Sequence, residues 1–276
     1  MPIWGVLAGL LLVIDGDSLL RSRWHPDTLA LVHIITLGVL GNAMFGSLLQ
    51  FLPAAAGVPL RGGRLGAWVH VVLNAGALSL VGGFQLASTP LLTLAGILLP
   101  LAFVALVGLI LPAVCRAAGQ RLLRAGVGAS LVFGLTTALL GGVLAICASG
   151  RLSLVMPPWV DVHAAFGLLG WVVLLLASVG RVVMPMFQGT GVPPVKCHAA
   201  WLGSLVVLLP VAAVLRLTGT DETGLPATLA LFGLSFALTV AWLQKRTTQA
   251  RRGPLWWSWR VGAFALVASV AALSWQ

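Results

Sequence analysis

Residues 162–180 read VHAAFGLLGWVVLLLASVG, a run without any Asp, Glu, Lys or Arg. A helix needs roughly 20 apolar residues to cross the hydrocarbon core of a bilayer, so this run predicts a transmembrane helix. It also contains one histidine, His163. A polar ring in hydrocarbon loses the hydrogen bonds that water would supply, and it therefore needs a partner. His163 is thus the first candidate functional residue.

The apolar character of this run extends over the whole chain. Of the 276 residues, 59% are hydrophobic and 8% are charged, which excludes an ordinary soluble domain. The net charge of +10 comes from short basic runs between apolar segments, a pattern typical of topology signals and not of nucleic-acid binding. The segments also lack the alternating pattern of a membrane barrel. We therefore predict an all-α, polytopic integral membrane protein whose partner is the lipid bilayer.

The hydropathy pattern predicts nine transmembrane helices. Their ranges are 2–20, 27–52, 65–86, 90–114, 122–148, 158–187, 194–216, 225–245 and 255–275. The first run is not preceded by a basic region or followed by a small-residue cleavage site, so we interpret it as a helix and not as a cleaved signal.

The distribution of charge predicts an orientation. Twelve basic residues follow helices two, four, six and eight: Arg61, Arg64, Arg116, Arg121, Arg124, Arg181, Lys196, Lys245, Arg246, Arg251, Arg252 and Arg260. The opposite side carries all six acids and only four basic residues: Arg21, Arg23, Arg151 and Arg216. The positive-inside rule therefore predicts an inner (cytoplasmic) membrane protein with both termini outside.

Four of the five histidines lie in predicted membrane segments and form two pairs at similar spacing. His33 and His163 are 130 residues apart (163 − 33), and His70 and His198 are 128 apart (198 − 70). Under the predicted orientation His33 and His163 lie toward the outer face, and His70 and His198 lie toward the inner face. The spacing predicts two pseudo-symmetric four-helix units, residues 1–120 and 121–250, followed by a ninth helix in residues 251–276.

Two imidazoles from separate helices are the ligands of a b-type haem, because neutral ring nitrogens can bind the iron on its two faces. The pairs His33/His163 and His70/His198 therefore predict one or two haem b groups and electron transfer across or within the membrane. The small residues after each histidine would let a flat macrocycle approach the helix backbone. No Cys-x-x-Cys-His motif occurs, which excludes covalent c-type attachment.

Four arginines near the two faces are candidate partners of haem propionates: Arg21, Arg23, Arg61 and Arg64. Guanidinium groups bind carboxylates well, although simple anchoring at the interface explains these residues equally well. We predict no catalytic residue. An electron-donor or acceptor protein, or a quinone, would be the redox partner, and a homo-oligomer or a larger complex is compatible with the sequence.

Other interpretations of the same histidines remain open at this point. An intramembrane histidine is often a hydrogen-bonding contact between helices. A transporter or metal-handling protein would use the histidines to bind Cu or Zn transiently along a pathway. A soft copper site is also compatible with Met184 and Met186. A scaffold subunit of a larger complex is a further alternative.

Two stretches resemble a known family. Residues 33–53 and the segments His163-Ala-Ala-Phe-Gly-Leu-Leu-Gly-Trp-Val and Arg181-Val-Val-Met-Pro-Met-Phe are similar to helices of subunit I of the haem-copper oxidases. They also resemble small haem-containing membrane proteins linked to nitric oxide. The resemblance covers two of the nine predicted helices. It implies that His33 and His163 bind a low-spin haem, with a function in electron transfer or in the response to nitric oxide.

The chain departs from the oxidase family in the features that reduce oxygen. It has no tyrosine and no adjacent histidines, whereas the family has a His-Pro-x-x-Tyr or similar motif and a His-His pair for copper. The resemblance therefore does not imply a terminal oxidase. Haem A synthases also double a four-helix bundle, but their ligands lie on alternate helices and not on successive ones.

Overall fold

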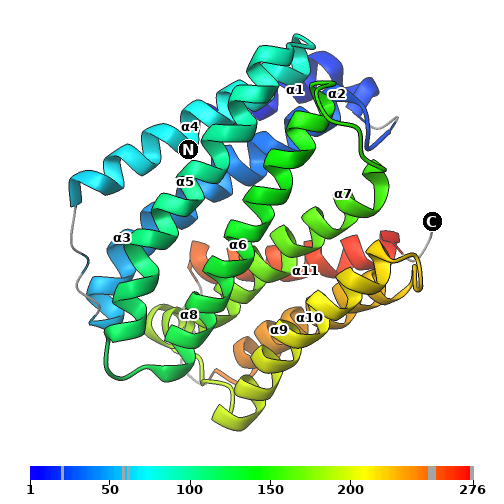
Figure 1. The fold of residues 1–276 in the computed structure, drawn as a ribbon. Helices are drawn as coiled ribbons and strands as arrows, with labels where there is room; N and C mark the ends of the chain where they lie inside the picture. Colours follow the sequence, from blue (N-terminus) through cyan, green and yellow to red (C-terminus); the bar gives the residue numbers. More distant parts are fainter. Residues whose placement is uncertain (20–21, 58–59, 61–62, 248–252, 274–276) are drawn as a thin grey trace. The chain divides into compact units, whose positions relative to one another are not determined.

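The computed structural model describes residues 1–19, 22–57, 60, 63–247 and 253–273, and this part of the chain is helical without any strand. The helices are shown in Figure 1. Their bounds are α1 Pro2–Leu19, α2 Pro26–His33, η1 Ile34–Gly41, α3 Asn42–Ala56, α4 Gly63–Gln85, α5 Thr89–Arg116, α6 Arg121–Ala148, α7 Met156–Ala165, η2 Phe166–Val173, α8 Leu174–Gln188, α9 Val195–Leu217, α10 Gly224–Lys245 and α11 Pro254–Leu273.

Seven helical segments in these ranges are long and apolar enough to cross a membrane. They are 26–54, 64–85, 89–116, 121–148, 156–188, 195–217 and 224–245. Each overlaps a segment predicted from hydropathy. Two of the ends have a local cause in the sequence, since Gly57 and Gly189 adopt the left-handed conformation that glycine tolerates at a helix C-terminus.

Two of the spans are composite helices that contain a π-helix. In residues 26–56 the π-helix η1 follows α2, and in residues 156–188 the π-helix η2 follows α7. Each π-helix is eight residues long. A π-helix is rare and is frequently found at functional sites, and its wider turn displaces side chains from the positions that an α-helix gives them. Both π-helices follow a predicted haem ligand within three residues.

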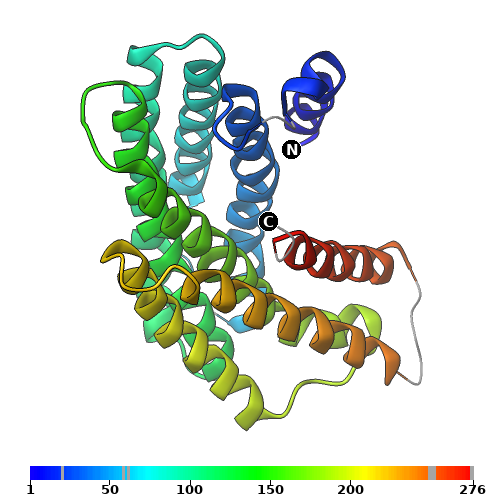
Figure 2. The ribbon, with the colours of Figure 1, turned by 90° about the vertical axis from the view of Figure 1, so that its right-hand side faces the viewer.

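The helices form two compact units, which we describe separately. The first contains residues 1–117 and 135–156, and the second contains residues 118–134 and 157–276. In the first unit α4 packs along α5 and also contacts the composite helix α2–η1–α3, while α1 packs on η1. In the second unit α10 packs against α9 and α11, as Figure 2 shows. The predicted division at residues 120 and 250 stays a prediction.

The helix bounds repeat at an offset of 132 residues. The differences 166 − 34, 173 − 41, 188 − 56, 195 − 63 and 217 − 85 all have this value, so η1, α3 and α4 match η2, α8 and α9. The histidine spacings of 130 and 128 residues differ from this offset. The position that matches His33 is Ala165, and a two-residue shift turns a side chain by about 200° around a helix. His33 and His163 are each the eighth residue of α2 and of α7, but relative to η1 and η2 they do not occupy equivalent positions.

The two π-helices also share a packing feature. The fifth residue of each is a glycine, Gly38 in η1 and Gly170 in η2. The ring of Trp4, from α1, lies where a Cβ on Gly38 would be, and the ring of Phe133, from α6, does the same at Gly170. An aromatic side chain of the preceding helix thus packs on the backbone of each π-helix. The small residues that we expected to face a macrocycle are covered by protein at these two positions.

A polar network connects three helices of the first unit. The indole Nε1 of Trp4 donates to Oδ1 of Asn74 at 2.8 Å, and Nδ2 of Asn74 donates to Oδ1 of Asn42 at 2.8 Å. Asn42 also donates to the carbonyl oxygen of Gly38 at 2.8 Å, inside η1. Asn42 is 4% exposed, and a buried amide must be paired because it cannot exchange its partners for water. The network therefore fixes α1 and α4 to the π-helix.

We expect Asn42→Leu to lower the free energy of unfolding by about 1–3 kcal/mol, because it leaves Asn74 and the Gly38 carbonyl without this partner. Asn42→Leu/Asn74→Leu should cost less than the sum of the two single variants, since the partners are removed together. Reversible unfolding in mixed detergent measures both. Gln50→Leu, on the exposed face of α3, is the control and should have little effect. Additive effects of the two asparagine variants would contradict the network.

Candidate functional site

His33 is the last residue of α2 and lies directly before the π-helix η1. Its Nδ1 lies 2.7 Å from the carbonyl oxygen of Leu29. A carbonyl only accepts, so Nδ1 carries the proton, and Nε2 is the nitrogen with a lone pair. This is the tautomer that a metal-binding imidazole needs, with the other nitrogen oriented by a backbone carbonyl. The ring also packs at 5.8 Å, between centroids, from Phe84 of α4.

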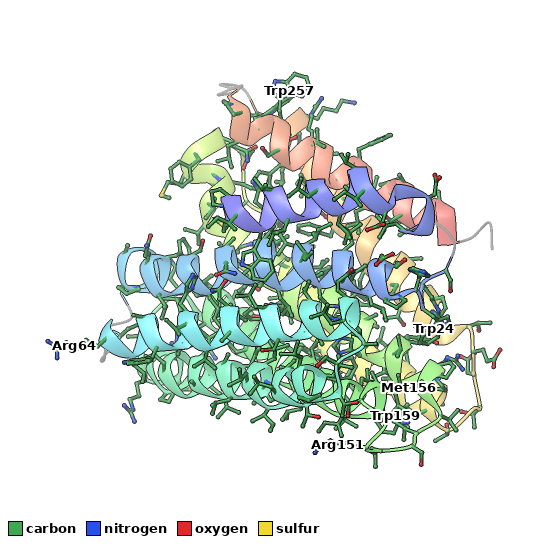
Figure 3. The ribbon with its side chains drawn as sticks, turned by 90° about the horizontal axis from the view of Figure 1, so that it is seen from above. Trp24, Arg64, Arg151, Met156, Trp159 and Trp257 are labelled. Carbon is green, nitrogen blue, oxygen red and sulfur yellow. The ribbon has the colours of Figure 1, made fainter. Side chains whose placement is uncertain are left out.

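His70 lies on α4, in the same unit as His33, but far from the part of α4 that His33 contacts. Fourteen residues separate it from Phe84, which corresponds to about 21 Å at 1.5 Å per residue. Its side chain is exposed, and its carbonyl oxygen accepts from Asn74 at 2.8 Å. In Figure 3 Arg64, near the start of α4, lies at one end of the first unit, and Trp24 and Arg151 lie at the other. His70 and the part of α4 that His33 contacts therefore lie far apart along this helix.

His163 occupies α7 in the second unit, three residues before η2, and is half-buried. Two residues earlier, Asp161 accepts from Nη2 of Arg216 at 2.9 Å and from its Nε at 3.2 Å. This pair joins the start of the composite helix to the end of α9. Arg216 also lies 3.6 Å from the carboxylate of Glu222. Arg216 thus pairs with two carboxylates at this end of the unit.

His198, near the start of α9, lies at the other end of the second unit. Eighteen residues separate it from Arg216, or about 27 Å of helix. It is 8% exposed, and its Nε2 is a buried atom that has no hydrogen-bond partner within the part of the chain that the structure describes. Buried side-chain nitrogens are nearly always paired, so this one marks a place where a partner belongs.

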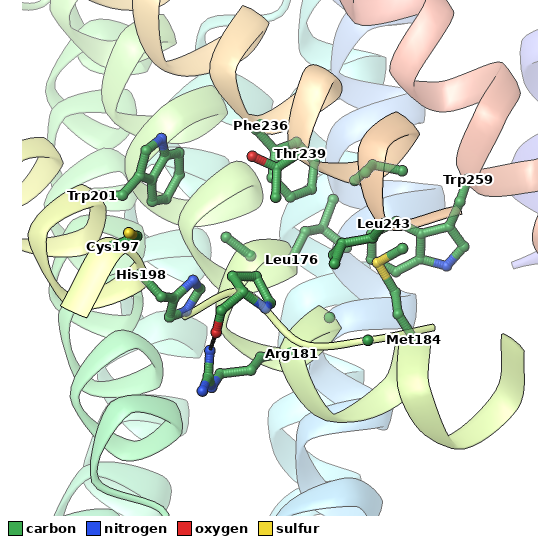
Figure 4. A pocket seen from close by; sticks show the side chains of 15 residues that line it. Leu176, Arg181, Met184, Cys197, His198, Trp201, Phe236, Thr239, Leu243 and Trp259 are labelled. Atoms are coloured by element: carbon green, nitrogen blue, oxygen red, sulfur yellow. Dashed lines mark hydrogen bonds between the residues drawn. The ribbon is translucent and has the colours of Figure 1, made fainter. Parts of the chain in front are cut away.

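A pocket of about 180 Å³ adjoins His198. Its walls come from α8, the segment before α9, and α9, α10 and α11, all within the second unit. Figure 4 shows His198 and Arg181 on one side of the pocket and Met184 and Trp259 on the other. Trp259 contacts the backbone of α8, because a Cβ on Gly180 would lie 2.9 Å from its ring. Because Gly180 has no side chain, the indole of Trp259 can occupy this space.

The structure accounts for the predicted ligand pairs only in part. Each pair takes one histidine from each unit: His33 and His70 belong to the first, and His163 and His198 to the second. Within a unit the two histidines are not brought together. The pairing His33/His163 and the pairing His70/His198 stay predictions.

The arginines predicted to bind propionates differ in their surroundings. Arg21 and Arg61 lie outside the described residues. Arg23 stacks on the ring of Trp24 at 4.8 Å, and Arg64 is exposed at the end of α4. The stacking of Arg23 and the exposure of Arg64 fit anchoring at an interface as well as they fit binding of a carboxylate.

We did not predict from the sequence the buried polar cluster near the ends of α8 and α10. Nε2 of Gln244 donates to Oε1 of Gln188 at 2.8 Å and to the carbonyl oxygen of Trp256 at 3.1 Å. Arg260 donates to Gln244 and stacks on the Trp256 ring at 4.0 Å. The neighbouring tryptophans differ in their surroundings, since Trp256 is 5% exposed and Trp257 is 57% exposed. Gln188 and Gln244, at the ends of predicted spans, could have indicated this polar cluster.

Within the described ranges no group of three or more His, Cys, Asp or Glu side chains is arranged to hold a metal ion. A site with two histidine ligands would not form such a group. Comparison with known proteins adds no relative: no family model, no curated protein and no solved structure matches this chain.

Proposed function

We propose that this protein is a membrane cytochrome of the b type, in which His33 and His163 bind one haem. The observation that carries this proposal is the pair of π-helices η1 and η2, each of which follows one of these histidines within three residues. Two rare local structures beside the two predicted ligands favour a common function.

The chemistry of His33 suits the proposed ligand role. The bond from Nδ1 to the Leu29 carbonyl orients the ring and places a proton on Nδ1, so Nε2 is the nitrogen that would bind a metal. A bound haem would supply reversible one-electron chemistry at its iron. The protein would hold the ring, exclude water from it with apolar helices, and keep it within the membrane. The donor and acceptor of the electrons are not identified by these residues.

The inner pair His70/His198 does not enter the proposal. His70 is exposed, and the pocket beside His198 measures about 180 Å³, which is below the roughly 300–1,000 Å³ of sites for drug-sized ligands and cofactors. The proposed protein spans the inner membrane nine times, with α1 and α11 added to the seven spans, and has both termini outside.

An absorption spectrum tests the proposal directly. The full chain, expressed in a haem-replete bacterial host and purified in mild detergent, should show a Soret band and, after dithionite, a sharp α band of six-coordinate low-spin haem. Haem and protein should be present in a ratio near one. A colourless protein with full helical content would overturn the cytochrome and favour transport of Cu or Zn, which metal analysis of the same sample would detect.

A further inference from the structure

The pocket beside His198 has one polar atom that its own walls do not satisfy. Trp201 donates to Oγ of Ser235 at 2.8 Å, Thr239 donates to the carbonyl oxygen of Ser235 at 2.7 Å, and Arg181 donates to the carbonyl oxygen of Pro193. Nε2 of His198 has no partner of this kind among the described residues. This nitrogen is closed off from the open volume of the pocket, so a ligand oxygen would accept a hydrogen bond from it once the imidazole ring turns toward the pocket.

The rest of the lining is apolar and aromatic. The rings of Trp201, Phe236 and Trp259 contribute to the walls, and the Trp201 and Phe236 rings lie 6.5 Å apart between centroids. Aromatic walls favour a flat ring, which can stack or pack edge to face against them. The volume of about 180 Å³ sets the size of the occupant, since an apolar cavity of about 150 Å³ holds a single benzene ring.

The pocket is open to an apolar surface. Leu176 lines it and is 40% exposed, and Cys197 lines it and is exposed as well. Both belong to helices that are candidate membrane spans. A ligand would therefore enter from the lipid side and could leave an apolar tail outside the pocket.

We propose that this pocket binds the headgroup of a membrane quinone, with a ring carbonyl accepting a hydrogen bond from Nε2 of His198 and the isoprenoid tail extending past Leu176. A quinone combines a single flat ring, a carbonyl acceptor and an apolar tail, which are the three properties that the pocket selects. Binding depends on the second unit alone. Only the use of the bound quinone as an electron donor or acceptor rests on the proposed haem.

Equilibrium binding of ubiquinone-1 to the full chain in detergent is the first test. We expect His198→Leu to weaken binding roughly tenfold, the cost of one hydrogen bond to a ligand in an apolar site. His198→Gln, whose amide can still donate, should recover part of the affinity. His70→Leu removes an exposed histidine of α4 and is the matched control. Unchanged affinity in His198→Leu would overturn the proposal.

Thiol protection tests the same site in the unaltered protein, so it does not depend on the folding of a variant. Cys197 lines the pocket, whereas Cys115 of α5 is exposed and does not. Saturating decylubiquinone should slow maleimide labelling of Cys197 at least several-fold and leave Cys115 unchanged. Decylbenzene, which has the ring and the tail without a carbonyl, should protect much less. Equal protection by both compounds would mean a merely apolar pocket and would contradict the proposal.

The two proposals can fail separately. Quinone binding by a haem-free His33→Ala variant is expected to equal that of the unaltered protein, because His33 is not part of the pocket. A colourless chain that binds ubiquinone-1 would overturn the cytochrome alone. A haem protein without Cys197 protection would overturn the quinone site alone.

Discussion

His33→Ala and His163→Ala are each expected to remove the low-spin haem spectrum. An imidazole ligand supplies one of two axial bonds to the iron, so its loss leaves at most a five-coordinate haem with weaker retention. Mutation of a residue that merely orients a ligand already costs 10–100-fold in metal affinity, and loss of the ligand itself should cost at least as much. The haem-to-protein ratio and the reduced α band measure the result.

Chemical rescue makes this prediction specific. A cavity variant, His163→Gly, should regain the six-coordinate spectrum when imidazole is added, because the free ring can occupy the vacated volume. His25→Ala, in the loop before α2, should keep the full spectrum, and its side chain is used only to cap α2 and to face Asp27. A normal low-spin spectrum in His33→Ala or in His163→Ala would exclude that residue as a ligand.

Hydropathy was sufficient to locate the helices. The predicted span 27–52 corresponds to the composite helix 26–56, and 194–216 corresponds to α9, 195–217. This agreement has a simple origin, since apolar length, charged ends and terminal glycines are all local properties of the chain. His70 lies about 21 Å along α4 from Phe84, the residue that packs against the His33 ring.

The π-helices could not be predicted in the same way. The sequence of η1, IITLGVLG, has the composition of any buried membrane helix. No residue in it requires the i→i+5 hydrogen bonds that define a π-helix. Its backbone is contacted at Gly38 by the ring of Trp4, which lies 34 positions away, and by the Asn42 amide, which lies four positions away. Periodicity within a window cannot reveal such a contact.

The spacing of the histidines and the repeat of the helices after them differ. His33 and His163 are 130 residues apart, as are the starts of α2 and α7, whereas η1, α3 and α4 repeat at 132. Gly38 and Gly170 are related by this second offset. A close approach of a ring to the backbone permits no other side chain there, whereas a ligand can move by half a turn if its partner moves with it.

The packing of the π-helices leads to the second large effect that we expect. Gly38→Leu and Gly170→Leu should each destabilise the fold by an amount at the upper end of about 1–3 kcal/mol, the range for overpacking a dense core. The new side chain would lie where the ring of Trp4 or of Phe133 lies, and because both rings are buried their displacement would open the interface with α1 or α6.

Matched glycines in the same composite helix and in the neighbouring span separate overpacking from a general effect of leucine. A Cβ on Gly46 of α3 or on Gly203 of α9 would meet nothing within 4 Å, so Gly46→Leu and Gly203→Leu should be neutral or slightly stabilising. Unfolding in mixed detergent measures all four variants on one scale. If Trp4 and Phe133 serve equivalent roles, Trp4→Ala should rescue Gly38→Leu and Phe133→Ala should rescue Gly170→Leu, while the crossed combinations should not. Equal losses for the covered and the open glycines would show that these rings do not pack on the π-helices in the folded protein.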